Sequence, residues 1–239
     1  MGSLRSNLHY VSQMEWEKKL NLLHCIASDL QIIHSQEFIH RDLHSGNILQ
    51  NKLYNAYVAD LGLSILKKTA LKAEHCGIYG ILPYIAPETL ERGQYTTASD
   101  IYSFGIIMWE ILYGRPVSYS QELGTQLQIE ICRNDLRPTI IENTHQRYVN
   151  LMKECWEIEP ENRPSAIKIC EILTEWLNNE FILSDLTKSD KLLKILKNTK
   201  STHTQPYSDD IYKSKFIKYT TSLCQNSGLN DLNIPSDKL

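Results

Sequence analysis

Residues 101–113 most constrain the fold of this chain, because they are apolar on nearly every side of a helix. Ser103 and Glu110 are among the few polar residues in this stretch, and Gly114 directly follows it. A helix without a polar face does not suit a surface, so it belongs in the centre of a core. The stretch is also shorter than the ~20 residues that a membrane span requires. The sequence therefore predicts a globular domain around one buried helix, which opens near Thr97 and ends at Gly114.

Four further segments have the spacing of amphipathic helices that could pack against such a core. Behind Ser12-Gln13-Met14-Glu15, apolar residues recur at three- and four-residue steps, and the S-x-x-E form predicts a capping box. The predicted helices span about residues 15–35, 123–133, 146–157 and 165–178. We therefore expect a mainly α fold built as a helical bundle.

The composition excludes several classes of function. The net charge of −3 and the pI near 6.2 lack the basic excess that binding to nucleic acid usually requires. The six cysteines are scattered, without a C-x-x-C pair or a His cluster at metal-ligand spacing, which favours reduced thiols in the cytosol. No apolar secretory segment opens the chain. We expect a soluble, cytoplasmic protein with no nucleic-acid partner and no membrane partner.

The composition changes after about residue 179, where we place a domain boundary. Residues 180–239 are rich in Ser, Thr, Lys, Asn and Asp, which predicts a polar, disordered tail. Lysines at three-residue spacing from Lys188 to Lys197 mark one face of a weak helix within it. Ile211, Tyr212 and residues 216–219 form its only aromatic cluster. This cluster either docks on the folded domain or on a partner, or has no function.

Polar residues concentrate in His40-Arg41-Asp42-Leu43-His44-Ser45-Gly46-Asn47, just before a predicted β-hairpin. Residues 48–50 and 56–59 are short strand-like runs around a turn at residues 51–55. The hairpin would return Asp60, at its end, to the side of Asn47, at its start. It therefore explains how two oxygen-bearing side chains thirteen residues apart can share a site.

Three motifs in this region resemble those of protein kinases. Residues 40–47 match the H-R-D-L-x-x-x-N catalytic loop, Asp60-Leu61-Gly62 resembles D-F-G, and Ala86-Pro87-Glu88 matches the A-P-E that closes the activation segment. Each motif is weak alone, but the three follow the order and spacing of the family. The resemblance covers residues 2 to about 179 and implies a protein kinase domain at residues 1–179. It corresponds to the helical C-lobe, with a small β-hairpin at the catalytic loop.

The resemblance implies roles for four residues. Asp42 would orient the attacking hydroxyl group and accept its proton, and Asn47 and Asp60 would hold Mg²⁺ against the phosphates of ATP. Amide and carboxylate oxygens suit Mg²⁺, which takes few ligands from the protein and completes its octahedron with water and phosphate. Arg41 would pair with a phosphate on the activation segment. The expected cofactors are ATP and Mg²⁺, and the expected partner is a protein substrate.

By the same resemblance, residues 60–88 form the activation segment, and Thr69 and Tyr79 are candidate phosphorylation sites. Ordinary loop composition explains these hydroxyl groups at least as well. Two buried contacts should hold the site in place. Asp100 of the central helix would bind the backbone of the catalytic loop, and Arg163 would pair with Glu88.

The residues that mark substrate class do not agree on one class. Ser/Thr kinases generally have a lysine two residues after the catalytic aspartate and a threonine in G-T-x-x-Y-x-A-P-E, where this chain has His44 and Ile81. The alanine and arginine of the tyrosine-kinase loop are also missing. The nearest resemblance is to the tyrosine-kinase-like group, which favours a Ser or Thr acceptor over Tyr. His44 either offers phosphate a pH-dependent contact or has no role. Leu61, in place of phenylalanine, keeps an apolar side chain beside Asp60.

The resemblance does not extend to the smaller N-lobe of a kinase. The sequence has no G-x-G-x-x-G before a strand and no V-A-I-K lysine, the parts that cover and position the phosphates of ATP. Without them, phosphoryl transfer loses water exclusion and preorganised charge. Two functions therefore stay open. The chain is either a truncated signalling kinase, or a non-catalytic pseudokinase lobe whose exposed apolar surface binds another kinase or a separate lobe.

Overall fold

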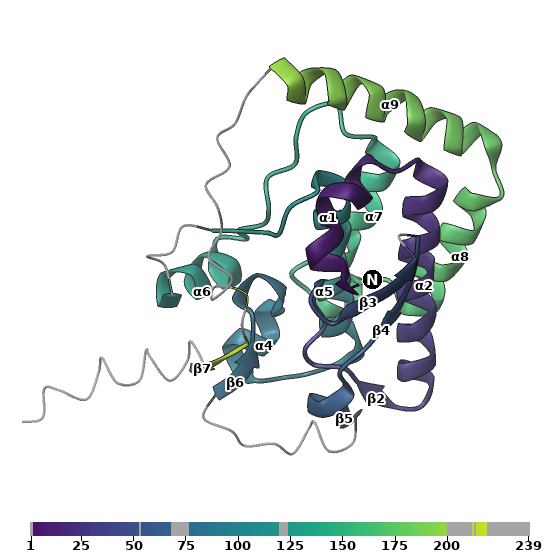
Figure 1. Ribbon diagram of the computed structural model, residues 1–239. Coiled ribbons are helices and arrows are strands. Elements are labelled where there is room, and N and C mark those ends of the chain that lie inside the picture. The colour runs from purple at the N-terminus through teal and green to yellow at the C-terminus, as the bar shows by residue number, and fades with distance from the viewer. Residues whose placement is uncertain are drawn as a thin grey trace, which may run out of the picture.

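The computed structural model describes residues 2–52, 54–67, 77–119, 124–199, 212 and 214–218, and within them helices dominate (Figure 1). The helices are α1 (Leu4–Gln13), α2 (Trp16–Ser35), α4 (Pro87–Arg92), α5 (Thr97–Tyr113), α6 (Gly124–Arg133), α7 (Gln146–Cys155), α8 (Ala166–Leu177) and α9 (Glu180–Thr199). The strands are β1 (Gly2–Ser3), β2 (Phe38–Ile39), β3 (Ile48–Lys52), β4 (Asn55–Val58), β5 (Ile65–Leu66), β6 (Gly77–Gly80) and β7 (Lys215–Lys218). The predicted mainly α fold is confirmed.

Helix α5 lies in the core and is buried from Ser99 to Tyr113. At its start, Thr96 and Ser99 form a reciprocal capping box, in which each side chain accepts a hydrogen bond from the other residue's backbone N–H. Gly114 ends the helix with a φ of 73°, a left-handed conformation that glycine adopts without strain. The central buried helix predicted from its apolar sequence is confirmed. Neither α5 nor any other helix in the described ranges is long and apolar enough to cross a membrane.

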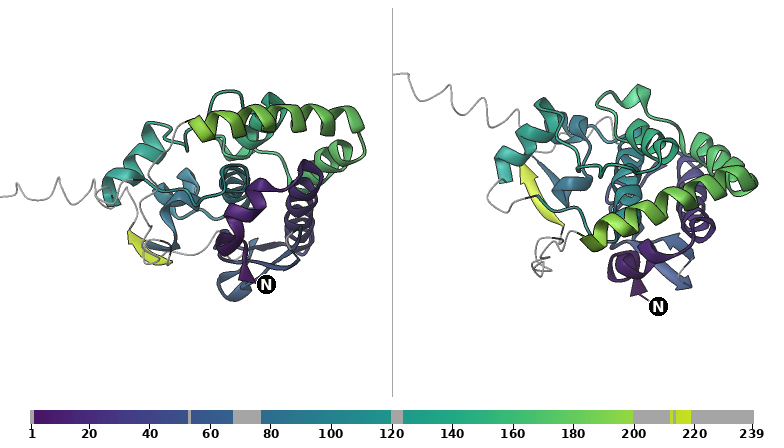
Figure 2. Two further views of the ribbon diagram at one scale, coloured as in Figure 1. Left: turned by 45° about the horizontal axis from the view of Figure 1, so that its top comes forward. Right: turned by 90° about the horizontal axis from the view of Figure 1, so that it is seen from above.

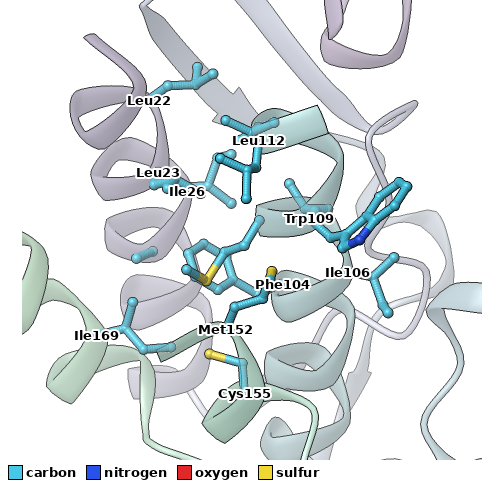
Figure 3. Close-up of a cluster of buried hydrophobic side chains, with 14 of the residues drawn as sticks. Leu22, Leu23, Ile26, Phe104, Ile106, Trp109, Leu112, Met152, Cys155 and Ile169 are labelled. Atoms are coloured by element: carbon cyan, nitrogen blue, oxygen red, sulfur yellow. The ribbon is translucent and has the colours of Figure 1, made fainter. Parts of the chain in front are cut away.

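Helices α1, α2 and α7 pack against α5, and α8 packs against α2. Figure 3 shows side chains of α2, α5, α7 and α8 in one buried cluster. Gly105 of α5 permits the closest approach, because a Cβ atom there would meet Cys155 Cβ of α7 at 2.9 Å. Burial of each large aliphatic or aromatic side chain contributes about 1.5–3 kcal/mol, so this cluster is the main source of stability. The labelled members are Leu22, Leu23 and Ile26 of α2, Phe104, Ile106, Trp109 and Leu112 of α5, Met152 and Cys155 of α7, and Ile169 of α8.

The start of α2 differs from the prediction, and the predicted capping box at residues 12–15 is wrong. Glu15 precedes the first turn of α2 but makes no side-chain capping bond. Ser12 belongs to the preceding helix α1, where its hydroxyl group donates to the His9 carbonyl oxygen at 2.8 Å. Because α1 already uses this serine, it cannot cap the helix that follows.

The predicted β-hairpin is present as β3 and β4, and it places the ends of the catalytic region. Ile48 pairs with Val58 and Gln50 with Ala56 in antiparallel register. The Val58 N–H donates to Asp29 Oδ2 of α2 at 2.8 Å, which fixes the hairpin against the helical core. Strand β1 joins the other side of β3, so the described sheet has the order β1-β3-β4.

The sequence predicted a disordered tail from residue 180 with a weak helix from Lys188 to Lys197, but helix α9 spans Glu180–Thr199. Asn179 caps its start, with Oδ1 accepting from the N–H groups of Phe181 and Ile182 at 3.0 and 3.2 Å. Ile182 and Leu186, one turn apart, are buried in the core. The prediction failed because the polar composition concealed this short apolar face. Of residues 200–239, only Tyr212 and residues 214–218 are described.

Candidate active site

The backbone of the catalytic loop is held by Asp100, as predicted. The N–H groups of His40 and Arg41 donate to Asp100 Oδ2 and Oδ1 at 2.9 and 3.0 Å. His34 Nε2 lies 2.9 Å from Asp100 Oδ2, and the carboxylate is only 1% exposed. Arg41 has a φ of 75°, a sparsely populated conformation that costs about 1–3 kcal/mol for a residue with a Cβ. The buried carboxylate of Asp100 therefore stabilises a loop conformation that its own sequence disfavours.

Asp42 follows in this loop and its carboxylate lies beside two hydrogen-bonding groups. The Ser214 hydroxyl group donates toward Asp42 Oδ1 and Oδ2, at 3.2 and 3.0 Å. His44 Nε2 lies 3.7 Å from Asp42 Oδ2. The residue is 9% exposed, so these contacts replace much of the hydration that an ionised carboxylate loses on burial.

The hydrogen bonds of His44 determine which ring nitrogen carries its proton. His44 Nδ1 accepts from the Gly46 N–H at 3.0 Å and lies 3.1 Å from Arg5 Nη2, which can only donate. Nδ1 is therefore the acceptor, and Nε2 carries a proton. This N–H side of the ring faces Asp42, so His44 supports the negative charge of the carboxylate.

The pKa of the Asp42 carboxyl group is lowered by this environment. Burial raises the pKa, but the hydrogen bond and charge of His44, followed by the Ser214 hydrogen bond and the charge of His40, outweigh it. The carboxylate is therefore ionised at neutral pH. This is the state that accepts a hydrogen bond from an incoming hydroxyl group.

The two predicted metal ligands, Asn47 and Asp60, differ in how firmly they are held. Asn47 Nδ2 donates to the Asp42 carbonyl oxygen at 2.9 Å, which leaves Oδ1 as the atom suited to a cation. Asp60 is exposed, with a φ of 62°, and its Oδ1 accepts from the Gly62 N–H at 3.3 Å. The Ala59 N–H donates to the Asn47 carbonyl oxygen at 2.8 Å, which brings the two residues to the same end of the hairpin.

Asn47 and Asp60 are a donor set of the kind that Mg²⁺ uses in proteins. Among the described residues, no three His, Cys, Asp or Glu side chains are grouped as a metal site. Mg²⁺ does not need such a group, because it is commonly held by one or two protein oxygens, with water and phosphate completing the octahedron. The amide oxygen of Asn47 and the carboxylate of Asp60 fit that requirement.

Arg41 lies beside Asp42, but its guanidinium group turns to Tyr95. The Arg41 Cζ atom is 4.2 Å from the centre of the Tyr95 ring, a cation–π distance. Its Nε is buried and has no hydrogen-bond partner within the described part of the chain. Of the candidate phosphorylation sites, Tyr79 is 54% exposed in β6, and Thr69 lies outside the described residues.

The predicted pair of Glu88 and Arg163 is present, and it lies at the C-terminal end of the activation segment. Arg163 Nη1 and Nη2 donate to Glu88 Oε1 and Oε2, both at 2.8 Å. Such a two-point contact is strong because both groups are charged and planar. Arg163 Nη1 also donates to the carbonyl oxygen of Ala98, in the first turn of α5, so the pair connects the activation segment to the core.

Sequence reasoning missed a buried carboxylate, Glu110, that connects to the catalytic loop through Tyr84. Glu110 of α5 accepts from the Tyr84 hydroxyl group at 2.5 Å and from the Val117 N–H at 3.0 Å. Tyr84 in turn lies 3.2 Å from the Ser45 hydroxyl group of the catalytic loop. Burial raises the pKa of Glu110 to about 7 against the lowering effect of these hydrogen bonds. A glutamate inside the apolar helix was the only sequence signal for this network.

Comparison with known proteins places this site in a defined family. The family model described as "Protein tyrosine and serine/threonine kinase" matches residues 1–173. The serine/threonine-protein kinase STY46 of Arabidopsis thaliana is 33% identical over 172 residues, which cover 70% of this chain and 29% of that protein. The serine/threonine/tyrosine-protein kinase HT1 of the same plant is 30% identical over 177 residues, which cover 73% of this chain and 45% of that protein.

A similar match comes from a second organism. The probable serine/threonine-protein kinase drkD of Dictyostelium discoideum is 33% identical over 171 residues, which cover 71% of this chain and 13% of that protein. The chain thus spans less than half of the length of each of these three relatives. The family-model match includes the catalytic-loop and activation-segment motifs, which lie within residues 1–173.

Proposed function

This chain belongs to the protein tyrosine and serine/threonine kinase family, and we propose that it acts in transferring the γ-phosphoryl group of ATP to a protein hydroxyl group. A Ser or Thr acceptor is favoured over Tyr, because STY46 and drkD are both named serine/threonine-protein kinases. One observation carries the proposal. The carboxylate of Asp42, in a loop fixed by Asp100, accepts hydrogen bonds from a serine hydroxyl group.

In this mechanism Asp42 orients the acceptor hydroxyl group and receives its proton as the oxygen attacks the γ-phosphorus. His44 keeps the carboxylate ionised until the proton arrives, since its Nε2–H side faces Asp42 Oδ2. Asn47 and Asp60 would hold Mg²⁺, which when bound neutralises charge on the phosphates. Asn47 also connects the proposed metal site to the proposed base, because its Nδ2 donates to the backbone carbonyl oxygen of Asp42.

Arg41 is proposed to respond to phosphorylation of the activation segment. Its buried Nε has no partner among the described residues, although a buried donor normally has one. A phosphate on that segment would supply an acceptor and a charge partner for the guanidinium group. Pairing with phosphate would compete with the present contact between Arg41 and the Tyr95 ring.

A second candidate function is a non-catalytic binding lobe, and one observation favours it. Large apolar side chains are exposed along residues 54–66, close to the proposed magnesium ligands. An apolar surface of this kind is expected to be covered by a partner, such as a nucleotide-binding lobe or another kinase. In either case we propose a cytoplasmic signalling role. The exposed residues are Tyr54, Tyr57, Leu61, Leu63 and Leu66, which are 42%, 46%, 52%, 39% and 46% exposed.

Asp42→Asn in the full-length protein separates these functions. The amide keeps the shape of the side chain but cannot accept the proton, so phosphoryl transfer from radiolabelled ATP to a protein substrate should fall by at least about 100-fold. Asp185→Asn is the matched control, since Asp185 is exposed on α9 and bonded to His145. Acid hydrolysis of the product identifies the acceptor as Ser, Thr or Tyr. Equal transfer by wild type and Asp42→Asn would overturn the proposal, and partner binding without transfer would favour the binding lobe.

A further inference from the structure

A segment from the far end of the chain contacts the catalytic carboxylate. Ser214 lies 172 positions after Asp42 in the sequence, yet its hydroxyl group donates toward both carboxylate oxygens, at 3.2 and 3.0 Å. A hydroxyl group bonded to the catalytic carboxylate is the arrangement that an acceptor residue must adopt before phosphoryl transfer. Tyr212 and residues 214–218, called here the docked segment, are therefore placed as a substrate would be.

The backbone of the docked segment adds a strand to the activation segment. Strand β7 pairs antiparallel with β6, with Lys215 opposite Gly80 and Lys218 opposite Gly77. Figures 1 and 2 show β7, in yellow, alongside β6. Gly80 lies where this strand meets the site, since a Cβ atom there would be 2.9 Å from Ile85 Cδ1 and 3.8 Å from Asp42 Oδ1. Strand addition is a general way to bind an extended peptide, because main-chain hydrogen bonds hold any sequence in register.

Side chains of the docked segment give this contact its specificity. Ile217, three residues after Ser214, is 8% exposed and belongs to a buried cluster of apolar residues. Phe216 packs edge-on against Tyr79 of β6, with ring centroids 5.4 Å apart. The other buried members of the apolar cluster include Ile39, Ile78, Ile85, Leu90, Leu127 and Ile131.

The other end of the docked segment is held by Arg5 of α1. Arg5 Nη1 donates to the Tyr212 carbonyl oxygen at 2.9 Å, and its Cζ lies 5.1 Å from the centre of the Tyr212 ring. Tyr212 is 5% exposed. Arg5 Nη2 also lies 3.1 Å from His44 Nδ1, the residue that faces Asp42. One arginine therefore connects the docked segment to the group that supports the catalytic carboxylate.

We propose that the docked segment is an intramolecular ligand of the peptide-acceptor site, with Ser214 in the position of the phosphoacceptor. The proposal rests on the function proposed above and extends it to the substrate class. The site would take an extended peptide with a serine or threonine, an aromatic residue two positions before it and an aliphatic residue three positions after it. While the docked segment is bound, an external protein substrate cannot reach Asp42.

Phosphoryl transfer to Ser214 would release the segment. The Ser214 oxygen attacks the γ-phosphorus of ATP, its proton passes to Asp42, the bond from the γ-phosphorus to the bridging oxygen breaks, and ADP leaves. The phosphoserine carries a charge of about −1.5 to −2 beside the Asp42 carboxylate. Like charges repel in this partly buried position, so the docked segment would leave and open the site to other substrates.

The test measures docking without ATP, so it does not depend on phosphoryl transfer. A fluorescent synthetic peptide of residues 210–220 is titrated into the full-length protein, and binding is followed by anisotropy. In the wild type the site is already occupied. Ile217→Asp in the protein should release its own segment and make the unmodified peptide bind at least about tenfold more tightly than to wild type, from loss of one buried aliphatic anchor. Phe181→Asp is the matched control, because Phe181 is 88% exposed on α9.

A second variant covers the outcome in which Ile217→Asp fails to fold. Ser214→Glu places a carboxylate beside Asp42 and changes an exposed residue, so folding should be retained. Hydrogen exchange of the amides in Gly77–Gly80 should accelerate by at least about tenfold in Ser214→Glu relative to wild type, because β6 loses its partner strand. Unchanged exchange, or equal peptide binding by wild type and a folded Ile217→Asp protein, would overturn the proposal. Docking in a protein that transfers no phosphate would refute the proposed function alone.

Discussion

Asp42 and Asp60, the two carboxylates proposed to act in catalysis, have opposite surroundings. Asp42 lies in a loop whose backbone is bonded to the buried Asp100, and its own oxygens have hydroxyl and imidazole neighbours. Asp60 is exposed and accepts one hydrogen bond of 3.3 Å within its own turn. The comparison indicates that this chain fixes the half of the site that is proposed to receive the acceptor hydroxyl group. In the half that would hold Mg²⁺, the Asp60 carboxylate is exposed and is bonded only within its own turn in the described part of the chain.

The surroundings of Asp60 indicate what kind of surface would complete the proposed magnesium site. Leu61 and Leu63, in the turn that follows it, are 52% and 39% exposed. Apolar side chains beside a functional carboxylate favour a covering surface, which would also exclude water from the phosphates. We therefore expect the magnesium half of the site to become ordered only when a nucleotide-binding partner or lobe covers it.

The largest expected effect comes from removing the support of the catalytic loop. Asp100→Ala leaves the buried N–H groups of His40 and Arg41 without an acceptor, which should lower the free energy of unfolding by about 3–5 kcal/mol. Urea unfolding followed by circular dichroism measures this difference. A loss below about 1 kcal/mol would mean that the loop does not depend on Asp100, and the contrast with Asp60 would disappear.

A third carboxylate, that of the buried Glu110, should make the stability of the protein depend on pH. The pKa of Glu110 is raised by burial to about 7 from its ordinary 4.5, so the folded state binds a proton that the unfolded state has released. The resulting stabilisation is complete below pH 4.5 and is lost as the pH rises to about 7, by at most roughly 3 kcal/mol. Glu110→Gln should remove this decline, because Gln cannot titrate but can accept from Tyr84.

Urea unfolding at pH 5 and pH 8 tests the role of Glu110. Wild type should be less stable at pH 8, and Glu110→Gln should show a smaller difference between the two pH values. An equal pH dependence in both proteins would assign the effect to other groups. Glu130→Gln serves as a control, since the carboxylate of the partly exposed Glu130 accepts hydrogen bonds from Gln126 and Asn134.

The smallest expected effect is on stability when Asp60 is changed. Asp60→Ala removes an exposed side chain with one long hydrogen bond, so the free energy of unfolding should change by no more than about 0.5 kcal/mol. Thermal unfolding under the conditions used for Asp100→Ala gives a direct comparison. A loss as large as that of Asp100→Ala would show that Asp60 has a structural role that its exposure does not reveal.

Sequence reasoning succeeded where a feature was determined by neighbouring residues. The apolar sequence of α5 predicted its burial, and the spacing of the strands predicted the hairpin between Asn47 and Asp60. The roles of Asp100 and of the pair between Glu88 and Arg163 came from resemblance to a family, and the contacts are present.

It failed where a distant or competing contact decided the outcome. Ser12 could not cap α2, because α1 already contained it. Residues 180–199 were assigned to a disordered tail with only a weak helix from Lys188 to Lys197, because their polar composition outweighed the apolar pair Ile182 and Leu186. The approach of Ser214 to Asp42 joins residues 172 positions apart, and no local pattern carries that information. The aromatic cluster around Tyr212 had only raised docking as one of two alternatives.

The most direct test of the two-part site is the magnesium dependence of phosphoryl transfer by the full-length protein, compared among wild type, Asp42→Asn and Asp60→Asn. We predict that Asp42→Asn lowers the rate by the same large factor, at least about 100-fold, at every Mg²⁺ concentration. Asp60→Asn should instead raise the Mg²⁺ concentration needed for half-maximal rate. Wild-type rates from Asp42→Asn, or an unchanged Mg²⁺ requirement in Asp60→Asn, would contradict the division of the site into a fixed acceptor half and an open metal half.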